Sequence, residues 1–377
     1  MNPAAFKSPF VAIACGGTGG HLFPGLAVAE ALRQRGCLVA LLVSPKEVDQ
    51  QAAKSAAGLE IFTLPAVGWQ NRNYFSFTRS FFRSFFAARK IFRRRRPDAV
   101  LAMGGFTSAP PVFAAKISGA KTFLHESNTI PGKSNRLLAR FVDAAFIGFP
   151  ETAAKLCAKK SWVTGTPVRS GFFPDPLSPL SPSVCRARLG LDPDRPTILV
   201  VGGSQGAHGL NELVLSALPL LKNRGWQWLH LAGARDFENV RAAYAACGIP
   251  AVVQPFLAEM DWALGAATAA VSRAGASSLA EIAARRLPAL LVPLPTAADN
   301  HQVFNAAAFA KSGAARLLEQ KNASPEKIAA AVDGLVGDEA ARRSVRDALA
   351  AWHAPQSAAQ IAEYIMVGVG LKPGADQ

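Results

Sequence analysis

The chain has 377 residues, of which half are apolar and 18% are charged, a composition typical of a globular protein. At roughly 150 residues per domain, this length predicts two or three domains, each large enough to bury a core without disulfides or metals. The five cysteines form no closely spaced pair, which argues against a C-x-x-C metal or redox site. The excess of 41 basic over 26 acidic residues gives a formal charge of +15 and predicts acidic partners: phosphates, nucleic acid or an anionic membrane.

The N-terminal segment resembles neither a membrane span nor a typical export signal. No apolar run in the chain approaches the roughly 20 residues that a membrane-spanning helix requires. The apolar stretch after Lys7 extends only from Pro9 to Cys15 and leads directly into a glycine-rich loop. We therefore interpret it as the first buried strand and expect a cytoplasmic protein.

The first half of the chain alternates short apolar runs with helix-length segments. The first helix is predicted from about residue 21 to residue 35. The predicted strands are residues 10–14, 38–43, 99–103, 121–125 and 144–147. This alternation predicts a parallel sheet with both faces covered.

The pattern stops between Pro167 and Pro196, where seven prolines and little helical periodicity predict a linker or domain boundary. A second series follows, with a helix from about residue 207 and a last helix over residues 356–367. Its predicted strands are residues 197–201, 226–231, 251–253, 269–271 and 289–292. Both halves open with strand, glycine loop and helix, so we expect two doubly wound domains with ligands at the carboxyl ends of the strands.

Two glycine loops are candidate phosphate sites, because glycine allows the backbone to approach an anion closely. The first is Gly16–His21, which is not the dinucleotide fingerprint, since Leu22 stands where its third glycine would be. The second is Gly202–Ala207, in which Ser204 adds a hydroxyl donor. One loop could hold a phosphate of a donor and the other a phosphate of an acceptor; the alternative is a tight turn that binds no ligand.

Two further glycine turns follow predicted strands, at Gly104–Phe106 and Ser272–Ser278. The second precedes a helix that we expect to open with capping serines. Glu281, which we expect in the first turn of that helix, either stabilises the helix dipole or accepts hydrogen bonds from a ribose diol.

Among the six histidines, His21 is the first candidate for a general base, because it lies at the mouth of the first loop. The alternative for His21 is a capping or packing role. The segment His125–Asn128 ends a strand and should face the ligand cleft. His208 and His301 occupy loop-to-helix positions, whereas His230 and His353 are expected to be structural.

No histidine pair has the spacing of a zinc site, and Asp192-Pro193-Asp194 precedes a strand at the wrong edge of a parallel sheet. We therefore predict no metal site in the protein.

Residues 69–96 are strongly biased, with nine basic residues, nine aromatic residues and no acid. Arginines and lysines at 79, 83, 90 and 94 share one helical face, and phenylalanines at 77, 81, 85 and 92 share the opposite one. Three interpretations remain open: an ordinary amphipathic helix, a membrane-interfacial surface and a nucleic-acid site.

Taken together, the motifs resemble those of the bacterial peptidoglycan glycosyltransferases that add N-acetylglucosamine to lipid I. The matching segments, in the order of that family, are Gly16–His21 with Phe23-Pro24-Gly25, His125–Asn128, Gly165–Arg169, Gly202–Ala207, Ser272–Glu281 and Asp299–Gln302. Singly each motif is weak, but the ordered set is specific to the family.

The resemblance implies a GT-B fold, with two Rossmann-like α/β domains that face a cleft. We expect an N-terminal domain of residues 1–166, a C-terminal domain of residues 167–353 and a terminal helix within 354–377 that returns to the first domain. The implied reaction transfers N-acetylglucosamine from UDP-N-acetylglucosamine to the 4-hydroxyl of the muramyl sugar of lipid I, with inversion, at the cytoplasmic membrane face.

The resemblance also assigns site residues. The acceptor side would use His21 and Glu126 as candidate bases. Leu257 and Arg169 would lie near the uracil, Ser204 near a phosphate and Glu281 at the ribose, with Gln302 at the sugar hydroxyls beside His301. The rest of the donor site would be Thr18, Gly19, Gly20, Asn128, Gly275, Ala276, Ser277, Ser278, Leu279 and Ala280.

No cofactor is expected, although a soluble magnesium ion could assist the diphosphate. The implied partners are the UDP sugar, lipid I and an anionic membrane surface, with no nucleic acid. Two other hypotheses stand beside this one: a different GT-B enzyme, either a glycolipid transferase or a UDP-sugar epimerase, and a nucleic-acid-binding protein that uses Arg93–Arg96.

Overall fold

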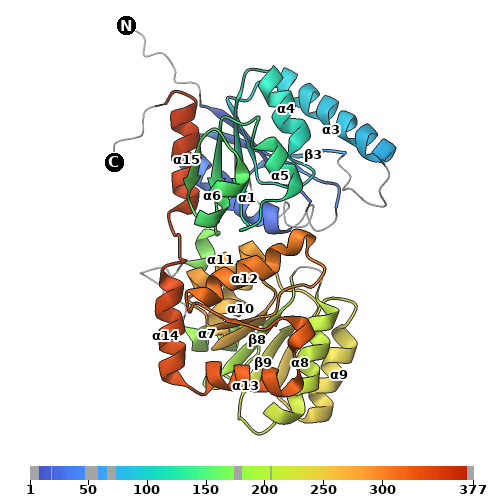
Figure 1. Ribbon diagram of the computed structural model, residues 1–377, viewed down its shortest axis with the longest axis vertical. Helices are drawn as coiled ribbons and strands as arrows, with labels where there is room; N and C mark the ends of the chain where they lie inside the picture. The colour runs from blue at the N-terminus through green and yellow to red at the C-terminus, as the bar shows by residue number, and fades with distance from the viewer. Residues whose placement is uncertain are drawn as a thin grey trace. The chain divides into compact units, whose positions relative to one another are not determined.

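The computed structural model describes residues 8–17, 19–46, 58–65, 74–173, 181–203 and 206–371. The chain divides into two compact units, residues 1–169 with 354–377 (unit 1) and residues 170–353 (unit 2). Each unit contains one parallel β-sheet with helices packed on it (Figure 1). The expected pair of Rossmann-like α/β domains is confirmed.

Unit 1 has a seven-stranded sheet in the order β3-β2-β1-β4-β5-β6-β7. Its strands are β1 (Phe10–Ala14), β2 (Leu38–Val43), β3 (Glu60–Thr63), β4 (Ala99–Ala102), β5 (Lys121–Glu126), β6 (Ala144–Ile147) and β7 (Ser161–Val163). Its α-helices are α1 (Gly19–Gln34), α3 (Tyr74–Arg94), α4 (Ala109–Ile117), α5 (Lys133–Leu138), α6 (Ala153–Leu156) and α15 (Ser357–Gly368).

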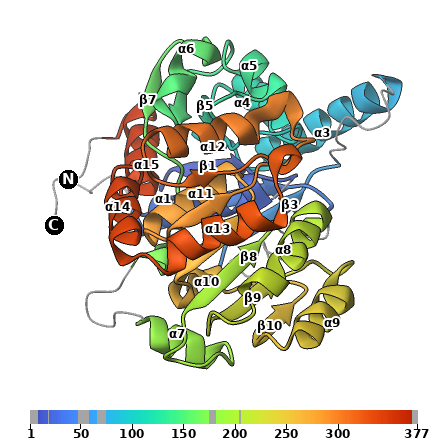
Figure 2. The ribbon, with the colours of Figure 1, turned by 60° about the horizontal axis from the view of Figure 1, so that its bottom comes forward.

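Unit 2 has a six-stranded sheet in the order β10-β9-β8-β11-β12-β13. Its strands β8, β9 and β10 are labelled in Figure 2. Its strands are β8 (Thr197–Val201), β9 (Gln227–Leu231), β10 (Ala251–Gln254), β11 (Ala269–Ser272), β12 (Ala289–Leu291) and β13 (Arg316–Leu317). Its α-helices are α7 (Pro182–Arg188), α8 (His208–Leu221), α9 (Phe237–Cys247), α10 (Met260–Ala266), α11 (Ala276–Ala284), α12 (His301–Lys311), α13 (Pro325–Val336) and α14 (Glu339–Ala350).

The two sheets share one topology, in which the strand order reverses direction beside the first strand of the unit. In unit 1 this point lies between β1 and β4, and in unit 2 it lies between β8 and β11. Doubly wound sheets bind ligands at this switch point, outside the carboxyl ends of the strands. The internal repeat predicted from the sequence is therefore real.

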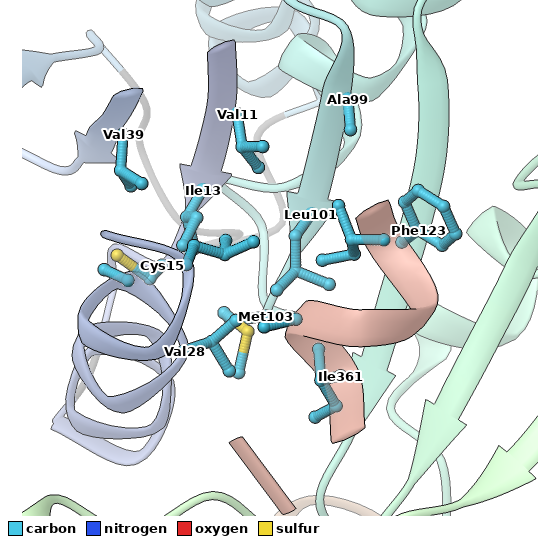
Figure 3. Packing of buried hydrophobic residues seen from close by; sticks show 14 of the residues in the cluster. Val11, Ile13, Cys15, Val28, Val39, Ala99, Leu101, Met103, Phe123 and Ile361 are labelled. Atoms are coloured by element: carbon cyan, nitrogen blue, oxygen red, sulfur yellow. The ribbon is translucent and has the colours of Figure 1, made fainter. Parts of the chain in front are cut away.

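Both faces of the unit 1 sheet are buried, which explains why its central strands are continuous apolar runs. On one face, Val11, Ile13 and Leu101 pack with side chains from α1 and α15 (Figure 3). On the other face, the alternate residues Ala12 and Val100 pack with α3 and α4.

The strands that the sequence did not predict lie at the edges of the sheets. β3 and β7 carry half-exposed or exposed side chains, and β13 has only two residues. Such strands bury too little surface to show an apolar run.

The proline-rich boundary was only partly a linker, because it contains helix α7. Ser181 caps this helix by accepting a hydrogen bond from Val184 N, and Pro182 occupies its first turn. Proline is compatible with that position because the first-turn N–H has no partner within the helix.

Helix α15, at the C-terminal end of the described chain, packs in unit 1 against α1 (Figure 1). Ile361, Ala362 and Ile365 on one of its faces are fully buried in the unit 1 core. On the same helix, Tyr364 stacks on Trp162 of β7 at a ring separation of 4.5 Å.

Ile361→Ala should lower the free energy of unfolding of unit 1 by about 2–5 kcal/mol, because it removes a fully buried side chain. Urea denaturation followed by circular dichroism measures this change. The matched control is Glu363→Ala on the exposed face of the same helix, with an expected change below about 0.5 kcal/mol. Equal losses in the two variants would contradict the packing role of α15.

Candidate functional site

The first glycine loop of unit 1 connects β1 to α1 in very little space. A β-carbon on Gly16 would lie 2.3 Å from the backbone nitrogen of Ser44. The loop is held by two side chains, because the Thr107 hydroxyl donates to Gly16 O at 2.6 Å and Lys46 Nζ donates to Gly17 O at 2.9 Å. The glycine spacing read from the sequence therefore reflects a steric requirement.

His21, the third residue of α1, lies against the glycine turn at Gly104–Phe106. A β-carbon on Gly104 would be 3.0 Å from His21 Cε1, and one on Gly105 would be 3.1 Å from His21 Cδ2. Only glycine lets the imidazole pack this closely on the backbone. The ring is half-buried at the carboxyl edge of the sheet, which suits a general base that must also meet a substrate.

Glu126 ends β5 and is buried, with 2% of its surface exposed. Its Oε1 accepts from the backbone and side-chain nitrogens of Asn128 at 2.9 and 3.1 Å. Its Oε2 accepts from Gly132 N at 3.0 Å and from Asn135 Nδ2 at 2.8 Å. A carboxylate that accepts four hydrogen bonds organises its loop, and Glu126 fixes the side chain of Asn128 in this way.

His125, the neighbour of Glu126, is completely buried. Its Nε2 lies 3.1 Å from Gly165 O, and its Nδ1 lies 3.2 Å from Ser127 Oγ. Because a carbonyl oxygen can only accept, Nε2 carries the hydrogen and Nδ1 accepts from the serine. Burial lowers the pKa of His125 to about 4, so this imidazole is neutral at physiological pH and serves the structure.

The remaining unit 1 residues of the predicted donor site occupy the same sheet edge. Gly19 and Gly20 open α1. The Arg169 guanidinium lies over the ring of Phe23, 4.6 Å from its centroid. Thr18, which the sequence also assigned to the donor, lies outside the described residues.

The second glycine loop, Gly202–Ala207, belongs to unit 2 and follows the carboxyl end of β8. Gly203 and Gly206 have φ values of 104° and 74°, in the region that favours glycine. A β-carbon on Gly206 would lie 2.6 Å from Ala232 O, so the loop runs directly against the segment after β9. Ser204 of this loop lies outside the described residues.

The fourth glycine turn differs in two details from the sequence prediction. Gly275, not a serine, is the N-cap of α11, so the cap position has no side chain to accept a hydrogen bond. The helix begins at Ala276, so Glu281 lies in its second turn and the proposed interaction with the helix dipole is wrong. Ser277, Ser278, Leu279 and Ala280 fill the turn between the cap and Glu281.

Gln302 and Arg273 bind the strand ends of unit 2 together. Gln302 Oε1 accepts from Ala274 N at 3.2 Å and from Leu294 N at 3.0 Å, which leaves its amide nitrogen as the group that can address a sugar hydroxyl. The buried Arg273 donates to Val292 O at 3.0 Å and to Pro293 O at 3.1 Å. Burial lowers the pKa of Arg273.

Two other predicted residues lie at this edge of unit 2. Leu257 is half-buried in the segment that follows β10. His301 begins α12, and its Nδ1 lies 2.8 Å from Ala298 O. Asp299 and Asn300 have φ values of 50° and 52°, a left-handed turn that directs the chain into this helix.

The basic aromatic helix α3 divides its phenylalanines between the core and the surface. Its buried stripe is Ser80, Ser84, Ala88 and Phe92, spaced by four residues. Phe82 and Phe86 are 52% and 61% exposed. Ordinary amphipathy therefore accounts for Phe92 but leaves two large aromatic side chains in solvent.

The exposed aromatic surface continues onto neighbouring elements. The Phe81 ring lies 6.2 Å from that of Phe113, which lies 5.4 Å from that of Phe141. Ile117 and Phe141 are 60% and 40% exposed. We call Phe82, Phe86, Ile117 and Phe141 the aromatic surface of unit 1. Four exposed cations lie on the helices α3 and α4 that carry most of it: Arg79, Arg83, Lys90 and Lys116.

Within the described ranges, no helix is both long and apolar enough to cross a membrane. In the same part of the chain, no group of three or more His, Cys, Asp or Glu side chains is arranged to hold a metal ion.

Sequence reasoning missed three organising residues of the two edges. Asn135 holds Glu126, Arg273 ties β11 to the chain after β12, and Asp236 binds His208. Asp236 could have been found, because it follows a predicted strand at its carboxyl end. Arg273 carries no local signal, since its partners lie about twenty residues away, and Asn135 is placed beside Glu126 only by the turn between β5 and α5.

Comparison with known proteins identifies relatives along most of the chain. Residues 11–147 match the glycosyltransferase family 28 N-terminal domain, and residues 197–362 match the family 28 C-terminal domain. The chain is 37% identical over 358 residues to the UDP-N-acetylglucosamine–N-acetylmuramyl-(pentapeptide) pyrophosphoryl-undecaprenol N-acetylglucosamine transferase of Anaeromyxobacter sp. (strain Fw109-5), covering 93% of this chain and 91% of the relative.

Two further comparisons agree. The transferase of the same name from Verminephrobacter eiseniae is 40% identical over 326 residues, with 86% of this chain and 89% of the relative covered. Among solved structures, the crystal structure of Acinetobacter baumannii MurG is similar at 27% identity and a TM-score of 0.73, with 96% of this chain and 100% of that chain covered.

The buried His125 predicts a pH dependence of stability. Its pKa is about 4 in the folded protein and 6.5 as an ordinary value, so between these values the unfolded chain binds more protons. The free energy of unfolding therefore falls as the pH falls, and His125 should contribute a loss of about 2 kcal/mol at pH 5 relative to pH 7.5. Urea denaturation of the wild type and His125→Asn at both pH values measures the effect. If the two proteins lose equal stability, His125 does not carry it.

Proposed function

We propose that this chain, which belongs to glycosyltransferase family 28 and within it to the lipid II-forming N-acetylglucosamine transferases, moves N-acetylglucosamine from UDP-N-acetylglucosamine to the 4-hydroxyl of the muramyl sugar of lipid I. The observation that carries the proposal is a similarity of 36–40% identity to transferases of that name over most of the chain. The enzyme is a hexosyltransferase of peptidoglycan synthesis, and its product is lipid II.

The unit 2 edge supplies the donor side of the proposed reaction. Leu257 would contact the uracil and the Glu281 carboxylate would accept hydrogen bonds from the ribose diol. The amide nitrogen of Gln302 would donate to the sugar, because its oxygen is already held by two backbone nitrogens. The glycine loop after β8 and the start of α11 would place backbone N–H groups against the diphosphate.

The unit 1 edge supplies the acceptor side. His21 would take the proton of the attacking 4-hydroxyl as the bond from that oxygen to the anomeric carbon forms. Asn128, oriented by Glu126 and by the Thr152 hydroxyl that donates to Asn128 O at 2.8 Å, would contact the N-acetylglucosamine of the donor. One base and a displaced UDP on opposite faces of the sugar give inversion.

Charge develops on the diphosphate as the bond from the anomeric carbon to the phosphate oxygen breaks. Backbone N–H groups at fixed helix starts stabilise that charge without reorganising. The reaction therefore needs no metal held by protein ligands, and we propose that any stimulation by magnesium comes from an ion that arrives with the diphosphate.

The aromatic surface of unit 1 supports peripheral binding to the cytoplasmic membrane face, where a polyprenyl acceptor is anchored. Each exposed phenylalanine could bury apolar area among acyl chains, and the surrounding cations could face anionic headgroups. A soluble sugar acceptor would require neither feature. The same surface favours a lipid partner over nucleic acid, because phosphate binding alone does not need exposed Phe82 and Phe86.

Transfer of labelled N-acetylglucosamine from the UDP donor to a short-chain lipid I analogue tests the function. Wild type should form the lipid II analogue, and His21→Ala should lower kcat by about 100-fold or more, since general-base catalysis contributes about that much. Glu281→Ala should chiefly raise KM for the donor.

The controls separate the alternatives. Without acceptor, the UDP donor should remain unchanged. Its conversion under these conditions would instead indicate an epimerase. The matched control is Glu363→Ala on the exposed face of α15, which should retain wild-type turnover. If folded wild type binds the donor but transfers nothing to the analogue, lipid I is not the acceptor; if His21→Ala keeps full kcat, His21 is not the base.

Sedimentation with vesicles tests the membrane surface. Phe82→Ser combined with Phe86→Ser should weaken binding to vesicles of phosphatidylglycerol and phosphatidylcholine at least about tenfold, because each buried phenylalanine contributes about 1.5–3 kcal/mol. Val184→Ser, an exposed apolar residue of unit 2, is the control. Unchanged binding of the double variant, or equal binding of wild type to vesicles and to random duplex DNA, would contradict this surface.

A further inference from the structure

His208, at the start of α8, is held by a buried carboxylate that the proposed reaction does not use. Its Nδ1 lies 3.1 Å from both carboxylate oxygens of Asp236. The histidine side chain is 48% exposed, whereas the aspartate side chain is only 10% exposed. An exposed imidazole is thus anchored on a buried acid at the carboxyl edge of the unit 2 sheet.

Asp236 is held in place by a series of buried, hydrogen-bonded side chains. The Tyr244 hydroxyl lies 3.1 Å from His230 Nδ1, and His230 Nε2 lies 3.0 Å from Asn211 Oδ1. Asn211 Nδ2 donates to Asp236 Oδ2 and to Ala232 O, each at 2.9 Å.

The acceptor groups determine which atoms in this series of hydrogen-bonded side chains carry the hydrogens. Since an amide oxygen only accepts, His230 donates from Nε2 and accepts from the tyrosine at Nδ1. Burial lowers the pKa of His230 to about 3 and raises the pKa of Tyr244 well above its ordinary value, so both stay neutral near pH 7. The core histidine predicted from the sequence is confirmed, and it belongs to this series.

The same reasoning sets the direction of His208. A carboxylate without a proton only accepts, so Nδ1 of His208 carries the hydrogen that Asp236 receives. The second nitrogen, Nε2, is then the atom available to a ligand, and it becomes an N–H donor when the imidazole is protonated. The charged groups that face this pair are Glu212, whose Oε1 lies 4.0 Å from Nε2, and Arg235, whose Nε lies 3.6 Å from Asp236 Oδ1.

The pair is attached to the second glycine loop at two points. His208 follows the loop directly in sequence, after Ala207. The carbonyl of Ala232, which Asn211 holds, is the group that a β-carbon on Gly206 would approach to 2.6 Å. Gly206, the segment after β9 and the pair of Asp236 and His208 are therefore linked through Asn211.

We propose that His208 is a further donor-site residue, whose protonated imidazole donates from Nε2 to an oxygen of the donor diphosphate, and that Asp236 is its positioning residue. This inference rests on the proposed function, in which the diphosphate lies on the second glycine loop. As the bond from the anomeric carbon to the phosphate oxygen breaks, its electron pair goes to that oxygen. His208 stabilises the charge through its hydrogen bond and transfers no proton.

Calorimetric titration of the full chain with UDP-N-acetylglucosamine at pH 6 tests the contact, and titration with uridine, which lacks the diphosphate, provides the comparison. His208→Ala and His208→Gln should weaken UDP-sugar binding about tenfold or more, the size of a hydrogen bond to a charged group. Uridine binding should not change.

Asp236→Asn should show a smaller loss of the same kind, because the imidazole loses its anchor. Glu238→Gln, an exposed carboxylate of α9 paired with Arg241, is the matched control and should behave as wild type. Far-ultraviolet circular dichroism and the melting temperature verify that each variant is folded.

Two outcomes overturn the inference. If His208→Ala binds the UDP sugar as wild type does at pH 6, the imidazole does not touch the diphosphate. If it weakens uridine and the UDP sugar equally, His208 only supports the loop. Failure of folded wild type to bind the UDP sugar would appear before any variant is compared, and it would overturn the proposed function together with this inference.

Discussion

Burial of both faces of each sheet is the constraint on which the rest of this protein depends. β1 and β8 are buried at every residue, and their neighbours pack helices above and below. A polar side chain can therefore reach a ligand only where a strand ends. Because the strands are parallel, these ends share one edge. At the end of β5 the apolar run gives way to His125 and Glu126, two buried polar residues whose hydrogen bonds hold the chain beyond the strand.

The shared edge leaves little room, and glycine resolves the crowding. The backbone at Gly16 passes the chain after β2 at a separation that excludes a β-carbon, and Gly206 passes the chain after β9 in the same way. The glycine loops thus do two things at once. They let strand ends from different parts of the sequence pack together, and in the proposed reaction they bring backbone N–H groups close to a phosphate.

Each unit also anchors its edge with a buried carboxylate held by an asparagine. Glu126 receives the side chain of Asn135, and Asp236 receives that of Asn211. The two acids differ in what completes their hydrogen bonding. Glu126 turns inward to backbone and amide donors, which suits a positioning role, whereas Asp236 turns one side toward the half-exposed His208. Similar scaffolds therefore give one organising acid and one acid that directs an imidazole outward.

The sequence by itself determined the central strands, since β1, β2, β6 and β8 end where the apolar runs end, and it determined the repeated strand–loop–helix unit and the family. Strands buried on both faces must be apolar throughout, so they can be recognised in the sequence as continuous apolar runs. Only the tertiary structure decided the edge strands, the second-turn place of Glu281, the exposure of Phe82 and Phe86, and the hydrogen-bonded role of Glu126. The edge strands and the exposure of the phenylalanines depend on which elements, distant in the chain, pack beside them. The start of α11 and the bonds of Glu126, whose partners lie within nine residues, depend instead on the backbone path of one turn, which a pattern of residue types does not determine.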